Sequence, residues 1–209
     1  METVRFYESH VRRFGYGFRA LGFGRRASQN RRFAAAAAIG ELHGKRVLDM
    51  GCGFGDFLGW LHERGVRPQY TGVDICAPMV ERCQQRFAGR DDARFAIGDA
   101  LTWSPGEPAE GCFDYVIASG IFGYASSDAQ KRVRPTLKRL FQMSRIGLAV
   151  NFLSWHAATR SPSRLYLRPA DVLTYALTLT PAVRLDHSYM PNDFTLALYR
   201  TPAWKEPKQ

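Results

Sequence analysis

Short apolar runs alternate with longer amphipathic segments along most of the chain. The apolar runs predict strands at about 46–50, 69–74, 93–97, 113–118, 146–153, 182–189 and 193–200. The segments between them predict helices at about 55–64, 78–87, 128–144 and 168–179. This alternation is typical of a parallel sheet covered by helices. The short Met-Pro-Asn link before the last strand indicates a hairpin, so that strand should run antiparallel to the others.

The N-terminal region has a different pattern. Val4, Tyr7, Val11, Phe14 and Phe18 follow a spacing of three and four residues, which predicts one helix with an apolar stripe packed on the main domain. The glycine-rich segment 15–24 then predicts a mobile loop or lid, and Ser28 is a candidate N-cap for a helix reaching about residue 42. We expect a single domain, residues 1–209, in which a helical cap (1–43) covers a core (44–201).

Composition narrows the class of protein. The 209 residues are 45% hydrophobic and 23% charged, as in ordinary globular domains. No apolar run approaches the roughly 20 residues of a membrane helix, and the first residues lack the apolar core of a signal peptide. The four cysteines form no Cys-x-x-Cys pair, which favours reduced thiols over a zinc site. We therefore expect a cytoplasmic protein with no metal site and no membrane partner.

Positive charge is concentrated near the N-terminus. The net charge is +10, and residues 1–33 hold eight arginines and two acids, which gives 8 − 2 = +6. Nucleic acid or an anionic small substrate would suit such a segment. A solvated helix face explains it equally well.

Residues 47–58 carry the most informative motif. An apolar strand leads into a turn with Gly51, Gly53 and Gly55, where a backbone without Cβ atoms can approach a ligand closely. Asp49 precedes the turn, and the next strand ends in Asp74 about 20 residues later. This order is typical of nucleotide-type cofactor folds, although the spacing departs from the G-x-G-x-x-G of NAD-binding proteins.

Four segments resemble the motifs of the class I S-adenosylmethionine (SAM)-dependent methyltransferases. They are residues 47–58, 72–76, 96–103 and 113–122, in the order and spacing of that family. The resemblance spans about residues 45–200 and implies SAM as cofactor. It also implies a Rossmann-like α/β fold: a seven-stranded, mostly parallel sheet with an antiparallel strand 7, helices on both faces and here a short N-terminal helical cap.

The resemblance also implies the cofactor-binding residues. The methionine portion of the cofactor would lie against Asp49, Gly51, Cys52, Gly53 and Gly55. The ribose hydroxyls would bind Asp74, and the adenine ring would lie between Ile75 and Met79. The adenine amine would bind Asp99, with Gly98, Ala100 and Leu101 beside it, and the methyl group would lie near Ser119 and Gly120. From the cap, we expect the cofactor carboxylate to meet an arginine, Arg25 or Arg26, or an amide at the helix start, that of Ser28 or Gln29.

Catalysis by methyl transfer needs mainly alignment, and a base only where the acceptor must lose a proton. His156, His187 and Tyr124 are the candidates for that role. The segment after the fourth strand, Ser119 to Phe122, lacks the Pro-Pro motif of nucleic acid amino-methyltransferases. We therefore expect a methyltransferase acting on an O, N or S atom of a small molecule, which is anionic or aromatic. An RNA methyltransferase and a non-catalytic SAM-binding subunit remain alternatives, and the oligomeric state stays open.

Overall fold

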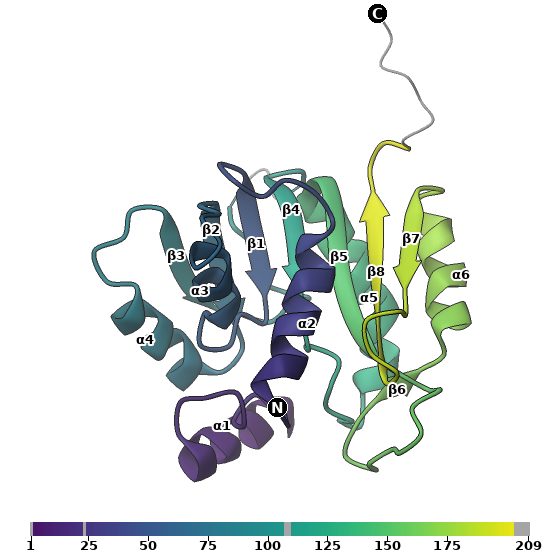
Figure 1. The fold of residues 1–209 in the computed structure, drawn as a ribbon, viewed down its shortest axis with the longest axis horizontal. Helices are drawn as coiled ribbons and strands as arrows, with labels where there is room; N and C mark the ends of the chain where they lie inside the picture. Colours follow the sequence, from purple (N-terminus) through teal and green to yellow (C-terminus); the bar gives the residue numbers. More distant parts are fainter. Residues whose placement is uncertain (1, 23, 107–109, 203–209) are drawn as a thin grey trace, which may run out of the picture.

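One mixed sheet organises the molecule (Figure 1). The computed structural model describes residues 2–22, 24–106 and 110–202, so Phe23 of the predicted lid lies outside them. The strand order is β3-β2-β1-β4-β5-β8-β7, and β6 pairs with β5 at one end. The strands are β1 (Arg46–Met50), β2 (Gln69–Asp74), β3 (Ala93–Ile97), β4 (Phe113–Ala118), β5 (Ser144–Ser154), β6 (Tyr166–Leu167), β7 (Val183–Asp186) and β8 (Asp193–Tyr199).

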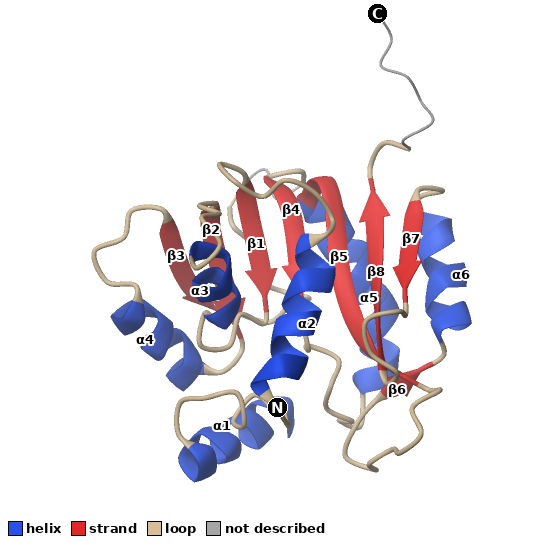
Figure 2. Ribbon diagram, viewed as in Figure 1, coloured by secondary structure: helices blue, strands red, loops and turns tan. Residues whose placement is uncertain are grey.

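Helices cover both faces of the sheet (Figure 2). They are α1 (Glu2–Phe14), α2 (Arg26–Ala37), α3 (Asp56–His62), α4 (Ala77–Arg86), α5 (Ala129–Met143) and α6 (Pro169–Leu179). Within β1, Val47 packs with residues of α2 and α3, whereas Leu48 and Met50 pack with residues of α5 and α6. Side chains on a strand alternate between faces, so one short apolar run supplies both layers of the core.

The predicted fold class is confirmed, including the reversed last strand. β8 pairs antiparallel with both β5 and β7, and the remaining described pairings in the sheet are parallel. The two-residue strand β6 was not predicted, because two residues carry no periodic pattern. None of the described helices combines the length and apolar character needed to cross a membrane.

The N-terminal helices differ from the prediction at their ends. Helix α1 stops at Phe14, before Gly15 with its φ of +66°, so Phe18 lies beyond the helix. Helix α2 begins at Arg26 and ends at Ala37, and its N-cap is Arg25. Ser28 therefore lies inside the helix, and its prediction as the N-cap was wrong.

Helix α1 lies at the end of the sheet toward which the parallel strands point (Figure 1). None of its residues is fully buried. The loop after α1 reaches the turn that follows β1, where a Cβ on Gly53 would lie 2.7 Å from the Leu21 side chain. The cap thus covers the region where ligands bind in open α/β sheets.

Candidate cofactor and acceptor site

A cavity of about 460 Å³ opens between the carboxyl ends of the strands and helix α1. Its volume lies within the range of small-molecule sites, roughly 300–1,000 Å³. All of the predicted cofactor-binding residues line it except Gly55, Leu101 and Arg26. The residues brought together are Gln29, Asp49, Gly51, Cys52, Gly53, Asp74, Ile75, Met79, Gly98, Asp99, Ala100, Ser119 and Gly120.

The glycine turn after β1 is closed by side chains from three directions. Gly51, Gly53 and Gly55 have φ values of +79°, +55° and +71°, a region that other residues rarely adopt. A Cβ on Gly51 would lie 2.2 Å from Ile121, and one on Gly55 would lie 2.6 Å from the Phe87 ring. Gly55 thus faces the end of α4 rather than the cavity, and the structure gives it a packing role.

Asp74 at the end of β2 organises this turn. Its Oδ2 accepts a hydrogen bond from the Gly53 amide, and its Oδ1 accepts one from the Cys76 amide, both at 2.9 Å. Burial raises the pKa of this carboxyl, and the backbone hydrogen bonds oppose that rise. The Ile75 amide also hydrogen-bonds this carboxyl. Because a carboxylate accepts about four hydrogen bonds, Asp74 keeps acceptor capacity for a hydroxyl group of a ligand.

Asp49 is almost fully buried below the turn, with 2% of its surface exposed. Burial raises its pKa to about 7; the hydrogen bond from Tyr70 lowers it, and the nearby Asp74 raises it further. A positively charged group of a ligand would stabilise the ionised form of this buried carboxyl.

Gln29 and Phe33 of α2 line the cavity, and Gln29 brings a polar side chain to it. Its Nε2 donates to Asp56 Oδ2 at 3.0 Å, and its buried Oε1 has no hydrogen-bond partner among the described residues. A buried acceptor of this kind calls for a donor from a ligand or water. Arg26, in contrast, is exposed, and its guanidinium lies over the Phe18 ring at 5.7 Å. Its predicted place at the cofactor carboxylate is therefore not supported by its position.

Asp99 follows β3, the edge strand beside β2, and lines the cavity. Its Oδ1 accepts a hydrogen bond from the Leu101 amide at 2.8 Å and another from Arg132 Nη2 at 2.6 Å. Arg132 also bonds the other carboxylate oxygen. Leu101 thus supports Asp99 through its backbone and does not itself line the cavity.

The end of β4 is fixed by a buried polar network. The Gly120 amide donates to Asn151 Oδ1 at 2.8 Å, and Asn151 Nδ2 donates to Asp193 Oδ1 at 3.1 Å. Asp193 also pairs with Arg32 of α2 at 2.8 Å. Ser119 Oγ is buried at the cavity and has no hydrogen-bond partner among the described residues.

The three candidate bases have different positions. Tyr124 lines the cavity, and its ring stacks on Phe6 of α1 at 4.1 Å. His156 is exposed, and His187 lies against Phe194, with its ring 6.2 Å from that ring. Neither histidine lines the cavity, because both follow strands at the β5–β8–β7 side of the sheet.

Several cavity residues were not predicted from the sequence. Glu2, Thr3 and Arg5 of α1 and Arg132 of α5 all line the cavity. Tyr7, which the sequence analysis placed in the apolar stripe of the first helix, lines it too, and burial raises the pKa of its hydroxyl to about 12. The apolar spacing along the first helix predicted that the helix packs on the main domain, but it did not indicate which of its side chains would line a cavity.

Comparison with known proteins agrees with this geometry. Residues 47–143 match the family model of a methyltransferase domain. A putative methyltransferase of Mycobacterium tuberculosis, Rv1506c, is 32% identical over 157 residues, which cover 72% of this chain and 90% of that protein. A malonyl-[acyl-carrier protein] O-methyltransferase of Paenibacillus is 28% identical over 93 residues, 44% of this chain and 33% of the relative.

A solved structure shows the same fold. Magnesium protoporphyrin IX methyltransferase from Synechocystis, crystallised with bound SAH (S-adenosylhomocysteine), superposes with a TM-score of 0.70 at 17% identity, covering 96% of this chain and 100% of that one. The cavity, the sheet order and these matches together lead to one conclusion. The chain belongs to the class I methyltransferases that use S-adenosylmethionine as methyl donor.

Proposed function

We propose that this enzyme methylates a carboxylate oxygen of a small anionic molecule. The observation that carries the proposal is the cavity itself, where the glycine turn and the acids after β1, β2 and β3 form one part and an arginine from the cap lies among the other lining residues. That arginine, Arg5, is exposed and makes no hydrogen bond or ion pair with any described residue. It is therefore available to pair with an acidic acceptor.

The residues around the glycine turn suit the parts of the cofactor in a definite order. The remaining acceptor capacity of Asp74 suits a hydroxyl group of the ribose, and that of Asp99 suits the adenine amine. The unpaired Oε1 of Gln29 and the carboxyl of Asp49 suit the ammonium group of the methionine portion. Gln29 would thus bind through its side chain rather than through its amide.

The acceptor would lie on the side of the cavity formed by the cap and the end of β4. Arg5 would hold the carboxylate, and the unpaired hydroxyl of Ser119 would donate to one of its oxygens. Ile121, Phe122 and Tyr124 supply apolar walls that exclude water. The malonyl group named in one relative ends in a carboxylate, which is consistent with this chemistry.

Methyl transfer to a carboxylate needs no general base, because the nucleophile is already ionised at neutral pH. This agrees with the position of His156 and His187 outside the cavity. The bound sulfonium supplies an electrophilic methyl group. A carboxylate oxygen forms a bond to that methyl carbon, the carbon–sulfur bond breaks, and its electron pair stays on sulfur. The protein contributes alignment of the two reactants.

Methyl-labelled SAM tests this proposal directly. The purified protein is incubated with labelled SAM and a cell extract, and RNA, protein and small molecules are then separated. We expect label in the small-molecule fraction that becomes volatile methanol after mild alkali, as methyl esters do. Label in RNA would overturn the proposal in favour of the RNA alternative, and alkali-stable label in small molecules would overturn the carboxylate assignment.

An Arg5→Gln variant tests the acceptor side. Losing a charge-assisted hydrogen bond of about 1.5–3 kcal/mol should raise KM for the acceptor at least tenfold and leave KM for SAM within twofold. Arg12→Gln is the matched control, because Arg12 is exposed on the same helix and does not line the cavity. Equal KM values for the acceptor in the two variants would exclude Arg5 as its anchor.

A further inference from the structure

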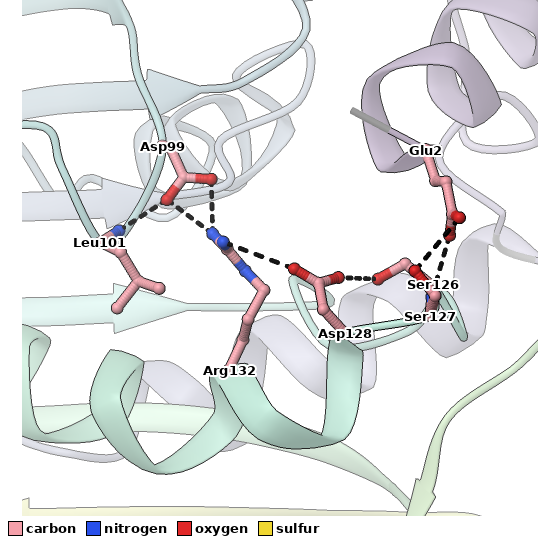
Figure 3. A network of polar contacts seen from close by, with 7 residues as sticks. All are labelled: Glu2, Asp99, Leu101, Ser126, Ser127, Asp128 and Arg132. Atoms are coloured by element: carbon pink, nitrogen blue, oxygen red, sulfur yellow. Dashed lines mark hydrogen bonds and ion pairs between the residues drawn. The ribbon is translucent and has the colours of Figure 1, made fainter.

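Two sets of polar contacts, joined through the backbone of residues 126–128, run along one wall of the cavity from Asp99 to helix α1 (Figure 3). At one end, Arg132 of α5 holds both oxygens of Asp99. Arg132 Nη1 also lies 3.8 Å from Asp128 Oδ2, one turn earlier on the chain. One guanidinium thus joins the proposed adenine subsite to the start of α5.

The contacts at the other end hold the cap. Ser126 Oγ donates to Asp128 at 2.8 Å, which orders the loop before α5. The next residue, Ser127, donates its amide at 2.9 Å and its hydroxyl at 3.1 Å to the carboxylate of Glu2. Glu2 belongs to the first turn of α1, 125 positions away in the sequence.

The geometry at Asp99 leaves room for a ligand. The carboxylate accepts one hydrogen bond from Leu101 and two from Arg132, out of about four that it can accept. The remaining position is on Oδ2, which no other described group occupies. Arg132 therefore fixes the direction of that position without filling it.

These contacts contribute little to the stability of the fold. The side chains of Arg132 and Asp99 are 35% and 25% exposed, and solvent screens ion pairs at such sites strongly. Helix α1 has no fully buried residue, and its apolar contacts come from Tyr7 and Val11, which pack on a small buried cluster, and from Phe6, which stacks on Tyr124. The hydrogen bonds from Ser127 to Glu2 add a polar contact at the first turn of the helix.

We infer that Arg132 and Glu2 are positioning residues that couple adenine recognition at Asp99 to docking of helix α1 over the cavity. The inference rests on the proposed cofactor placement. Adenine bound at Asp99 stabilises one arrangement of Arg132 and Asp128, and that arrangement presents Ser127 to Glu2. In return, a docked α1 favours the arrangement that binds adenine, because coupling between two sites is reciprocal.

Binding of SAH to purified variants tests the coupling. We expect the Kd from calorimetry to rise about tenfold in Arg132→Gln and about threefold in Glu2→Gln. In the double variant the Kd should equal that of Arg132→Gln, because the path from Glu2 is already cut. Lys131→Gln and Glu8→Gln are matched controls on α5 and α1, outside the cavity, and should bind as the wild type does. Independent effects, giving a Kd about thirtyfold higher in the double variant, would overturn the inference.

Hydrogen exchange provides a readout that is independent of affinity. In the wild type, saturating SAH should slow the exchange of the amides of residues 2–14 at least fivefold relative to the ligand-free protein. In Arg132→Gln, SAH should not slow their exchange. Equal protection in both proteins would overturn the inference while leaving the proposed function intact. Failure of the wild type to bind SAH would overturn the proposed function and the inference with it. Unfolding midpoints of the ligand-free variants should match the wild type within about 2 °C, because the pair is partly exposed and screened by solvent.

Discussion

Three aspartates along the cavity share a residue type but differ in environment. Asp74 is held by backbone amides, Asp99 by a guanidinium, and Asp49 by the Tyr70 hydroxyl in a buried position. Asp49 therefore has the least compensation for its charge, and its pKa rises to about 7. Since the folded state holds the proton more tightly than the unfolded chain, ionising Asp49 costs folding free energy as the pH rises from about 4 toward 7.

This environment predicts a pH dependence of cofactor binding. An ionised Asp49 attracts the ammonium of SAH, so affinity should increase about tenfold between pH 6 and pH 8, as the ionised fraction rises through a pKa of about 7. Calorimetry across this range measures the effect. Asp49→Asn should bind SAH with a flat profile, which separates Asp49 from the titration of Asp74 and Tyr70 beside it. A flat profile in the wild type would contradict the prediction.

The residues that the sequence located share one property: they lie in continuous local motifs. Asp49, Asp74 and the first two glycines of the turn stand next to strand ends, so their place at the cavity follows from the strand assignment. Gly55 has the same spacing but faces Phe87, because the start of α3 turns it away. Glu2, Arg5 and Arg132 carry no local motif, and only long-range packing brings them to the site.

At the scale of elements, the central strands were the most predictable part of the fold. The bounds of β1, β2, β3 and β4 match the expected ranges, because each is a short apolar run between polar turns. Helix ends were less predictable, as the wrong assignment of Ser28 shows. The position of α2 against the sheet could not be predicted, because it is fixed by long-range contacts, among them the packing of Phe33 and the buried pair of Arg32 and Asp193, which are 161 residues apart.

That pair leads to a prediction on stability. The side chains of Arg32 and Asp193 are 8% and 1% exposed, and removing one partner of a buried pair costs about 3–5 kcal/mol. Arg32→Met should therefore lower the free energy of unfolding by at least about 3 kcal/mol in urea titrations. Adding Asp193→Asn should restore part of the loss. The control is Arg31→Met, at an exposed neighbour on α2, and an equal loss there would show that the pair itself is not responsible.

At the scale of the whole molecule, the basic N-terminal segment separates into distinct parts. Arg32 is buried against Asp193, and Arg5 lines the cavity. The other arginines are exposed and do not line the cavity: Arg12, Arg13, Arg19, Arg25, Arg26 and Arg31. These six exposed arginines would attract anions at long range, whereas Arg5 lies where it can bind an acceptor in the cavity.

This division predicts how activity responds to salt. Proteins that bind nucleic acid through phosphate contacts lose about 10³–10⁵ in affinity between 50 and 200 mM salt. A small acceptor held by Arg5 inside the cavity is screened far less, so kcat/KM should fall less than about fivefold over that range. The triple variant Arg12→Gln, Arg13→Gln and Arg19→Gln should retain kcat/KM within twofold at 200 mM salt, where long-range attraction is weak. A steep loss with salt in the wild type, removed in the triple variant, would instead identify the outer arginines as the binding surface and favour an RNA acceptor.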